Sequence, residues 1–492
     1  MYFKNATPES VGISSKTILK FLKTLESYNL CTHDIIMAKG DKIFFESYWA
    51  PFNKDFKHRM YSVTKSFVAI AVLFAVDEGL LSLDDKFVKF FPEAKDVFKD
   101  DILLEATIDD MLKMESSRHF GNDWFSDKPD KRFMNYFTAS GFDKIPGTLF
   151  AYDSSGSYML GVIVEKLTGM TFIDYLKKKA LRDIGFSEDS YCLKAPGGYS
   201  WGDSALLCTA RDLLLFARFV MNKGNWLGKQ YINPELIEKA TTKQIDNDVT
   251  SVTGFGSYGY GYQIWMNQGG GFSFIGMGDQ FAICDPKSDF IFIINSDNQG
   301  SALSRPIFHH EVFNTIIPQL GDAIAEDKDA QNELEEYCNN LKLYALSGGV
   351  ETPCADEVNG SKYILDKNPM GIEYIKFDFK KEKGTLTYKN EQGEKKVVFG
   401  MGYNEFGKFP QEGYSDEVAT QYAPGHYYDC AYSAIWSEEK KLKIKVQIID
   451  KYFGNGCWIF SFKDNRVMVS MTKTAEDFMK EYSGIAIGRK EF

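Results

Sequence analysis

Ser62 and Lys65 form a pair of side chains whose types and spacing suit covalent catalysis. They stand three positions apart in the segment Ser62-Val63-Thr64-Lys65, at the start of an apolar run that predicts a buried helix. Because residues i and i+3 share one face of a helix, the amine can reach the hydroxyl. The positive end of the helix favours an oxyanion, and a lysine taken out of water can accept the serine proton. This spacing indicates a nucleophilic serine activated by a lysine.

The same Ser-x-x-Lys spacing occurs at two further places, so the surroundings must distinguish them. Ser437 opens a polar turn, and Ser470 lies in an alternating run, where the lysine three positions on would point to the opposite face of a strand. Ser62 stands ahead of an apolar helix. The spacing by itself leaves a plainer interpretation open, in which Ser62 caps the helix and Lys65 is a solvated residue of its first turn.

Four segments that follow one another along the chain extend this observation into a family resemblance. They are Met60-Tyr61-Ser62-Val63-Thr64-Lys65-Ser66-Phe67, Asp77-Glu78-Gly79-Leu80-Leu81-Ser82-Leu83-Asp84-Asp85, Ala106-Thr107-Ile108-Asp109-Asp110-Met111-Leu112-Lys113-Met114 and Pro146-Gly147-Thr148-Leu149-Phe150-Ala151-Tyr152-Asp153-Ser154-Ser155-Gly156. From about residue 8 to about residue 300 the chain resembles the serine β-lactamase and penicillin-binding-protein superfamily. Within it, the chain is most similar to the branch of class C β-lactamases, family VIII-type carboxylesterases and 6-aminohexanoate-dimer hydrolases.

The resemblance implies a role for Tyr152. The second motif of the family is Tyr-x-Asn, and its tyrosine faces the nucleophile as a proton carrier; Tyr152 matches that tyrosine. Ser154 stands where the family usually has asparagine, so it would orient the substrate with a shorter polar group. Composition alone favours a different interpretation of Tyr152, as a core residue between Phe150 and Tyr158.

The third motif of the family, Lys-Thr-Gly or His-x-Gly, corresponds to Phe274-Ile275-Gly276. Phe274 takes the place of the cation that binds a substrate carboxylate, which favours a less charged ester or amide over penicillins and cell-wall peptides. By family position, the backbone N–H of Met277 would pair with that of Ser62 as an oxyanion hole. A plain glycine-rich entry to a strand is the alternative interpretation.

A second nucleophile pattern, Gly198-Tyr199-Ser200-Trp201-Gly202, matches Gly-x-Ser-x-Gly. That motif requires a strand before the serine and a helix after it, as in α/β-hydrolases. Here Ala195-Pro196-Gly197 precedes it, so we do not expect Ser200 to be the nucleophile.

Composition excludes several classes of partner. The formal net charge of −11 gives no support for a nucleic-acid or anionic-membrane partner. The apolar run Phe67 to Val76 is about half the ~20 residues that a membrane-spanning helix needs. The eight cysteines form no Cys-x-x-Cys pair and the six histidines are scattered, so we expect no metal site and no cofactor. With no apolar signal-peptide core after Met1, these features predict a cytoplasmic protein with reduced thiols.

Periodicity predicts an α+β first domain. Helices are expected over Ser15 to Tyr28, Ser66 to Glu78, Ile108 to Met114 and Ser157 to Leu167, and strands at Ile35–Ala38, Ile43–Phe45, Tyr260–Met266, Phe281–Cys284 and Phe290–Ile294. With the resemblance, this pattern implies a β-lactamase/transpeptidase-like antiparallel sheet flanked by helices, with a helical subdomain, over residues 1–325.

The pattern changes in the last third of the chain. A charged, helical stretch begins at Glu326, and a polar loop runs from Gly348 to Gly360. Beyond it, hydrophobic and polar residues alternate with period two, which predicts an all-β barrel or sandwich. We therefore expect a linker over 326–349 and an all-β domain, similar to the lipocalin-like modules of some family members, over 350–492.

These observations predict a serine hydrolase that cleaves a small ester or amide through an acyl-enzyme on Ser62, with Lys65 and Tyr152 as general base and acid. A β-lactamase or D-amino-acid peptidase or amidase is one alternative. A binding protein that kept the fold without catalysis is another, motivated by the departures at Ser154 and Phe274. The C-terminal domain could wall the cleft, bind a ligand or mediate a homodimer.

Overall fold

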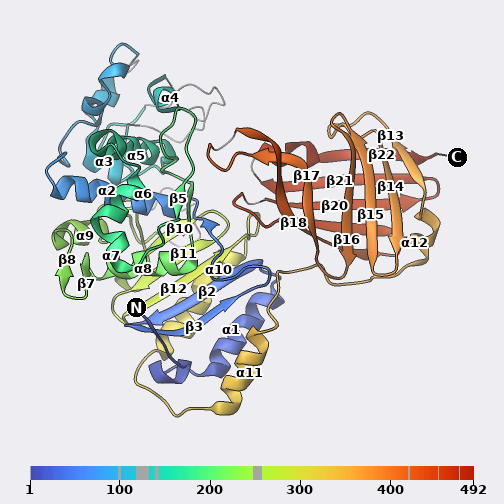
Figure 1. Ribbon diagram of the computed structural model, residues 1–492, viewed down its shortest axis with the longest axis horizontal. Coiled ribbons are helices and arrows are strands. Elements are labelled where there is room, and N and C mark those ends of the chain that lie inside the picture. The colour runs from blue at the N-terminus through green and yellow to red at the C-terminus, as the bar shows by residue number, and fades with distance from the viewer. Residues whose placement is uncertain are drawn as a thin grey trace. The chain divides into compact units, whose positions relative to one another are not determined.

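The structure is a computed structural model that describes residues 2–97, 101–117, 132–138, 143–247, 257–418, 421–452, 454–475 and 477–491. The chain forms two compact units that divide between Lys342 and Leu343, and a short segment at Asp416 to Val418 belongs with the first (Figure 1). Among the described residues, no helix has both the length and the apolar character needed to cross a membrane.

The first unit is built around a seven-stranded sheet in the order β1-β3-β2-β12-β11-β10-β9. Its strands are β1 (Lys4–Asn5), β2 (Thr32–Lys39), β3 (Lys42–Tyr48), β9 (Trp265–Met266), β10 (Phe272–Gly276), β11 (Gln280–Asp285) and β12 (Phe290–Ser296). Neighbouring strands are antiparallel except for β1 and β3. The early hairpin joins the late strands through β2 and β12, with Ile36 opposite Ile293. The predicted α+β class is confirmed.

Helices cover both faces of this sheet. On one face, a buried cluster joins α1 (Ser15–Ser27), α10 (Ser304–His310) and α11 (Lys328–Cys338) to apolar side chains of the strands. The other face is covered by α2 (Val63–Asp77) and α8 (Ala210–Met221), and α5 (Ser154–Thr168) packs against α2 (Figure 1). Shorter elements complete the unit: α3 (Ile108–Leu112), α4 (Arg132–Thr138), α6 (Phe172–Leu176), α7 (Arg182–Ile184), α9 (Pro234–Ala240), β4 (His58–Arg59), β5 (Tyr191–Cys192), β6 (Leu206–Cys208), β7 (Asn225–Trp226) and β8 (Lys229–Gln230).

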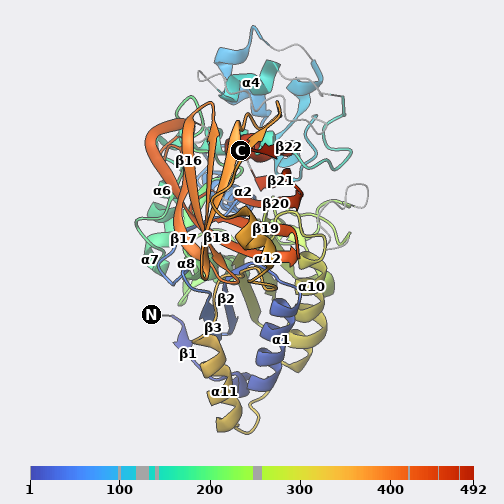
Figure 2. The same cartoon turned by 90° about the vertical axis from the view of Figure 1, so that its right-hand side faces the viewer.

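The helix α11 differs from the expected linker over 326–349. It lies beside α1 in two perpendicular views (Figure 2), and Leu334 on its inner face is buried in the core of the first unit. Asp327 caps the helix by accepting from Ala330 N. The many charges of this segment lie on the face turned to water, which explains why composition suggested a linker. The first unit therefore extends to Lys342.

The expected strand Tyr260–Met266 is also shorter than predicted, because β9 contains only Trp265 and Met266. Gln263 has a φ of +56°, in the left-handed region that side chains other than glycine rarely adopt. This residue bends the chain toward α3, where its backbone N–H bonds to the Leu112 carbonyl at 3.0 Å. The aromatic residues ahead of it are buried without belonging to a strand.

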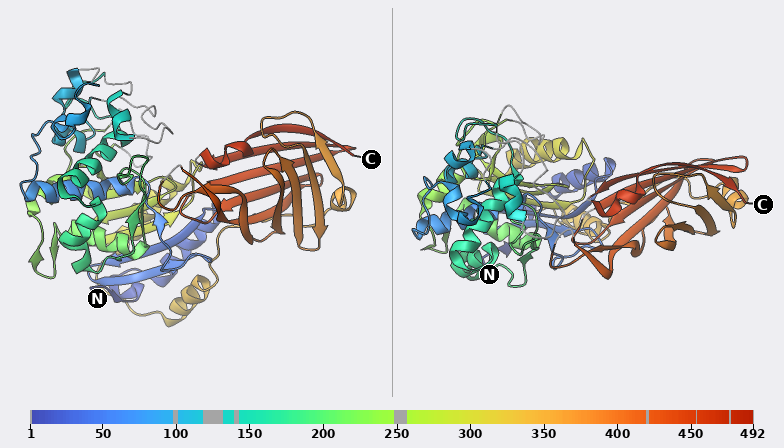
Figure 3. Two further views of the ribbon diagram at one scale, coloured as in Figure 1. Left: turned by 45° about the horizontal axis from the view of Figure 1, so that its top comes forward. Right: turned by 90° about the horizontal axis from the view of Figure 1, so that it is seen from above.

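The second unit is a closed barrel. Its strands follow the order β16-β15-β14-β13-β22-β21-β20-β19-β18-β17, and a pairing of β16 with β18 closes nine of them (Figures 1 and 3). Their bounds are β13 (Lys362–Leu365), β14 (Tyr374–Lys380), β15 (Lys383–Asn390), β16 (Gly393–Met401), β17 (Glu405–Tyr414), β18 (Tyr422–Glu438), β19 (Lys441–Ile448), β20 (Gly454–Lys463), β21 (Arg466–Ala475) and β22 (Gly484–Lys490). The period-two pattern predicted this architecture. Within the expected loop from Gly348 to Gly360, a short helix α12 (Pro353–Val358) forms.

Candidate active site

A sharp turn places Ser62 at the start of α2. The strand β4 ends at Arg59, and the Met60 N–H is fixed by the Leu206 carbonyl at 2.8 Å. Tyr61 then takes a φ of +45°, a conformation that costs on the order of 1–3 kcal/mol and is typical of functional sites. Ser62 is the N-cap of α2. The candidate nucleophile therefore lies at a strained turn between β4 and α2.

Lys65 points from the first turn of α2 to Ser62. Its Nζ donates to Ser62 Oγ at 2.9 Å and to the backbone carbonyl of Asp203 at 2.7 Å. The residue is 1% exposed. This contradicts the plainer interpretation in which Lys65 is a solvated residue: the amine is removed from water and directed to the hydroxyl.

Tyr152 completes the group. The Lys65 Nζ lies 5.1 Å from the centre of the Tyr152 ring, and the same ring stacks on Trp265 with centres 5.6 Å apart. Tyr152 stands two residues ahead of α5, whose N-cap is Asp153. The structure thus brings Ser62, Lys65 and Tyr152 together from two helix starts that are 90 positions apart in the sequence.

The position next to Tyr152 is occupied by a capping residue. Asp153 Oδ1 accepts from Ser155 N at 2.9 Å, and Asp153 Oδ2 accepts from Ser116 Oγ at 3.1 Å. Ser154, which replaces the asparagine of the family motif, is the half-buried first residue of α5. The acidic cap fixes the turn that carries Tyr152.

The end of β10 lies against the nucleophile segment. A Cβ added to Gly276 would come within 2.4 Å of the Met60 carbonyl, so only glycine allows this approach. Met277 follows directly and is 40% exposed. Phe274 is fully buried, with its ring 5.3 Å from that of Phe216 in α8. The structure therefore brings Gly276 and Met277 to the nucleophile, whereas Phe274 packs in the core beneath them.

Asp203 is the site residue that sequence reasoning missed. Besides its carbonyl, which accepts from Lys65, its buried carboxyl group lies in the electrostatic field of Lys65, Arg132 and Arg59. Burial raises the pKa of Asp203, and these three cations oppose the rise. The residue directly follows Gly202, whose Cα lies 3.7 Å from the position of a Cβ on Gly161 in α5. The Gly-x-Ser-x-Gly loop thus supports the site by close packing.

Ser200 itself has no part in this group. It is 1% exposed, and its backbone N–H donates to Glu165. An isolated bridge links Lys194 and Ser200, so the serine lies in a loop and not between a strand and a helix. The α/β-hydrolase interpretation fails on this geometry.

A buried acid–histidine pair joins β2 and β4. His58 Nδ1 is 3.4 Å from Asp34 Oδ2, and Asn295 Nδ2 donates to Asp34 Oδ1 at 2.9 Å. His33 stacks against His58 with ring centres 5.2 Å apart. Burial raises the pKa of Asp34 to about 8 and lowers the pKa of His58 to about 3. The pair therefore holds one proton over most of the ordinary pH range.

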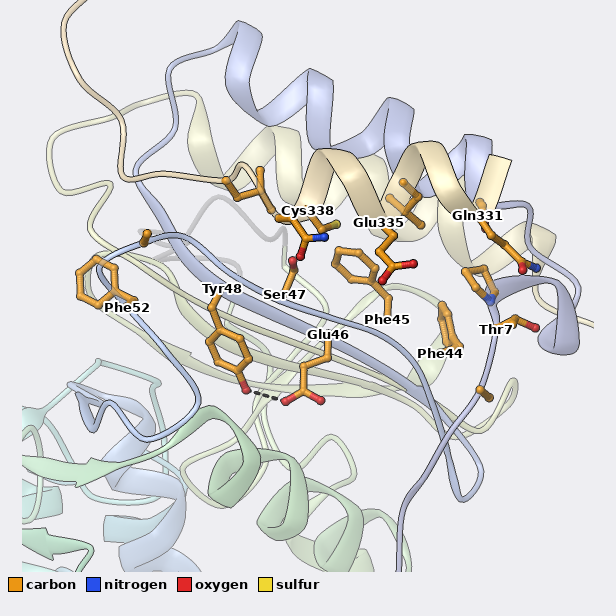
Figure 4. A pocket seen from close by; sticks show the side chains of 17 residues that line it. Thr7, Phe44, Phe45, Glu46, Ser47, Tyr48, Phe52, Gln331, Glu335 and Cys338 are labelled. Carbon is orange, nitrogen blue, oxygen red and sulfur yellow. Dashed lines mark hydrogen bonds between the residues drawn. The ribbon is translucent and has the colours of Figure 1, made fainter. Parts of the chain in front are cut away.

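A separate cavity of about 660 Å³ lies between β3 and α11. Phe45 and Ser47 face the helix, and Tyr48 donates to Glu46 on the opposite side of the strand (Figure 4). Its lining includes none of the residues grouped around Ser62. The cavity is therefore separate from the group around Ser62.

Comparison with known proteins identifies the family of the first unit. A family model described as Beta-lactamase matches residues 35–311. A 6-aminohexanoate-dimer hydrolase from Paenarthrobacter ureafaciens is 24% identical over 315 residues, which are 58% of this chain and 79% of that protein.

Solved structures show the same fold. A proposed 6-aminohexanoate-dimer hydrolase from Bacillus anthracis, 18% identical, has a TM-score of 0.54 and covers 64% of this chain and 87% of its own. A proposed β-lactamase from Bacteroides dorei, 17% identical, has a TM-score of 0.50 and covers 62% of this chain and 97% of its own.

The first unit therefore has the fold of a β-lactamase-like hydrolase. Because the family model spans more than half of the chain, the chain belongs to the Beta-lactamase family. The predicted resemblance is confirmed, and the protein is a hydrolase of that family.

Proposed function

We propose that this protein is a serine hydrolase that cleaves a small ester or amide through an acyl-enzyme on Ser62. The observation that carries the proposal is the 2.9 Å contact between Lys65 Nζ and Ser62 Oγ, with the amine buried. A nucleophile and a base within hydrogen-bond reach, the base held by a third group, is the arrangement that activates a serine. Here the third group is the Asp203 carbonyl.

In the proposed reaction, Lys65 takes the proton of Ser62 as Oγ attacks the carbonyl carbon. The backbone N–H groups of Ser62 and Met277 stabilise the oxyanion. Lys65 and Tyr152 then deliver the proton to the leaving alcohol or amine, and the carbon–heteroatom bond breaks. Water, deprotonated by the same pair, attacks the acyl-enzyme, and the proton returns to Ser62 Oγ as the acid departs.

The substrate class rests on the third motif. Phe274 offers no charge and is buried, so the place where the family presents a cation for a substrate carboxylate has none. This supports an uncharged ester or amide. The name of the 24% identical relative, a 6-aminohexanoate-dimer hydrolase, supports the amide within this class. Nitrocefin hydrolysis as fast as ester hydrolysis would favour a β-lactamase instead.

Ser62→Ala tests the proposal. The variant should lose p-nitrophenyl acetate turnover and labelling by a fluorophosphonate while its thermal unfolding stays unchanged. Ser437→Ala, in an exposed Ser-x-x-Lys pattern on the second unit, is the matched control and should keep both activities. Wild-type protein that takes up no fluorophosphonate would support the binding-protein alternative.

We also propose that the protein works in the cytoplasm. All eight cysteines are free thiols, which supports a reducing compartment.

A further inference from the structure

A three-residue turn carries Met277, whose backbone N–H is the second donor of the proposed oxyanion hole. The turn joins β10 to β11, and Gly276 pairs with Gln280 on either side of it (Figure 1). Gly278 and Asp279 have φ values of +76° and +69°, and residues in this left-handed region let the chain reverse within so short a loop. The direction of the Met277 N–H therefore depends on what holds the turn.

Two buried side chains lie within hydrogen-bond distance of all three carbonyl groups of the turn. Gln280 Nε2 donates to the Met277 carbonyl at 3.1 Å and to the Ser296 carbonyl of β12 at 2.6 Å. Ser296 Oγ can donate to the Gly278 carbonyl at 2.8 Å or to the Asp279 carbonyl at 3.0 Å. Gln280 and Ser296 are both fully buried. These contacts tie the turn to β12.

Gln280 also lies beside the close approach between β10 and the nucleophile segment. A Cβ built on Gly276 would lie 3.1 Å from the Cβ of Gln280 and 2.4 Å from the Met60 carbonyl oxygen. Met60 stands two positions ahead of Ser62, which carries the other donor of the proposed oxyanion hole. Gln280 therefore packs where the strand that leads to Met277 meets the segment that leads to Ser62.

The amide of Gln280 suits this position by its polarity. Both of its partners are carbonyl oxygens, and the NH₂ group of the amide has two protons to donate to them. A methionine has a similar length but no donor, and a glutamate would direct negative charge at both carbonyls. These two substitutions therefore separate the hydrogen bonds of Gln280 from the volume of its side chain.

We propose that Gln280, assisted by Ser296, is a positioning residue of the oxyanion hole: it holds the Met277 peptide so that its N–H points to the reacting oxygen. The inference rests on the function proposed above. Donors of an oxyanion hole stabilise the developing charge because they are fixed in place before the reaction. The Met277 side chain is 40% exposed, so its own packing contributes little to this order, and the buried contacts of the turn must supply it.

Gln280→Met tests the inference with p-nitrophenyl acetate as substrate. The variant loses both donated hydrogen bonds, so kcat should fall about 10- to 100-fold while KM changes less than about threefold. A short alkylboronic acid forms a tetrahedral anion on a nucleophilic serine, so its inhibition constant should rise by about the factor by which kcat falls. Gln280→Glu should lose at least as much activity as Gln280→Met.

Asn267→Leu is the matched control, because Asn267 is a buried amide at the other end of β10. Its Nδ2 donates to the carbonyls of Phe272 and Cys284 at 2.9 and 3.3 Å and to Ser273 Oγ at 3.1 Å. Removing these bonds should lower the thermal midpoint as Gln280→Met does, because both variants lose buried hydrogen bonds. The control should leave kcat and the inhibition constant of the boronic acid unchanged.

An active wild type with an equally active Gln280→Met variant would overturn this inference and leave the proposed function intact. Equal losses of kcat in Gln280→Met and Asn267→Leu would also overturn it, because a general loosening of the sheet would then explain both. If Gln280→Met does not fold, Ser296→Ala decides: a fall in kcat of at least about threefold supports the inference, and an unchanged kcat overturns it. Wild-type protein with neither ester turnover nor fluorophosphonate labelling would overturn the proposed function, and this inference with it.

Discussion

Replacing Gln263 by methionine should weaken both the fold and the reaction, because this residue joins three helices around the site and its side chain holds two of them. The amide Nε2 donates to the carbonyls of Met111 and Leu112, the last two residues of α3, at 2.9 and 3.0 Å, and Oε1 accepts from Ser157 Oγ of α5 at 2.5 Å. The residue is 2% exposed. Its backbone carbonyl accepts from Ser66 Oγ of α2 at 2.8 Å, and this contact survives the substitution.

The magnitude follows from the three lost hydrogen bonds. At about 1 kcal/mol of net stability each, their removal costs about 3 kcal/mol. Methionine keeps the side-chain length without the amide, so the loss reports polar contacts more than volume. Ser157→Ala is the graded control, because it removes the Oε1 contact and a longer contact of 3.3 Å to the Asp153 carbonyl but keeps both Nε2 bonds, and it should cost about 1 kcal/mol. Urea unfolding followed by tryptophan fluorescence measures both.

The catalytic effect separates positioning from stability. In Gln263→Met, α2 with Ser62 and Lys65 is less firmly tied to α5 with Tyr152, so kcat for p-nitrophenyl acetate should fall at least about tenfold with little change in KM. An unfolding free energy within about 1 kcal/mol of the wild type would refute this reasoning. So would a Ser157→Ala loss as large as that of Gln263→Met.

Three further outcomes are expected. Gly276→Ala places a Cβ 2.4 Å from a backbone carbonyl and should reduce ester hydrolysis about 100-fold. The control Gly407→Ala, on an open part of β17, should leave hydrolysis unchanged. Full activity of the Gly276→Ala variant would contradict the close approach. Phe274→Lys should destabilise the protein by more than about 3 kcal/mol without producing nitrocefin hydrolysis, since the side chain is fully buried; a thermal melt equal to the wild type would disprove this. Unfolding free energy should fall by about 1 kcal/mol as the pH rises from 6.5 to about 8, because the folded Asp34–histidine pair retains most of its proton in that window, whereas the unfolded histidine is only half protonated at pH 6.5 and loses that proton. In Asp34→Asn, urea midpoints should instead be constant above pH 6.5 and decrease below it, where the unfolded histidine takes up a proton that its buried form does not.

The helix starts of the site were open to prediction because they depend on local chemistry. Ser62 precedes an apolar run, and Tyr152 precedes a cap at Asp153, so short windows of sequence contain the signal. The seven-stranded sheet was only partly predictable. Within its strands, apolar residues either alternate with polar ones or form continuous runs, and this pattern is visible in the sequence. The pairing of β2 with β12 is not, because it joins segments about 250 residues apart.

Other parts of the site have no local signal. The acceptor on Asp203 is a main-chain carbonyl, which every residue has, so its position follows from the packing of Gly202 and not from its type. The burial of Phe274 depends on Phe216 in α8, far away in sequence. The left-handed turn at Gln263 contradicts the apolar pattern around it, which is why a strand was expected there.

The order of strands has a consequence for synthesis of the chain. The hairpin of β2 and β3 leaves the ribosome first, but the partner that covers the open side of β2 is β12, which ends at Ser296. At roughly 5–20 residues per second, that edge waits on the order of 10–50 s with its backbone groups unpaired. During this interval the buried strand Ile35–Ala38 is exposed to other nascent chains. Yield of folded protein should therefore depend on how fast the ribosome reaches β12, and on whatever shields the hairpin until then.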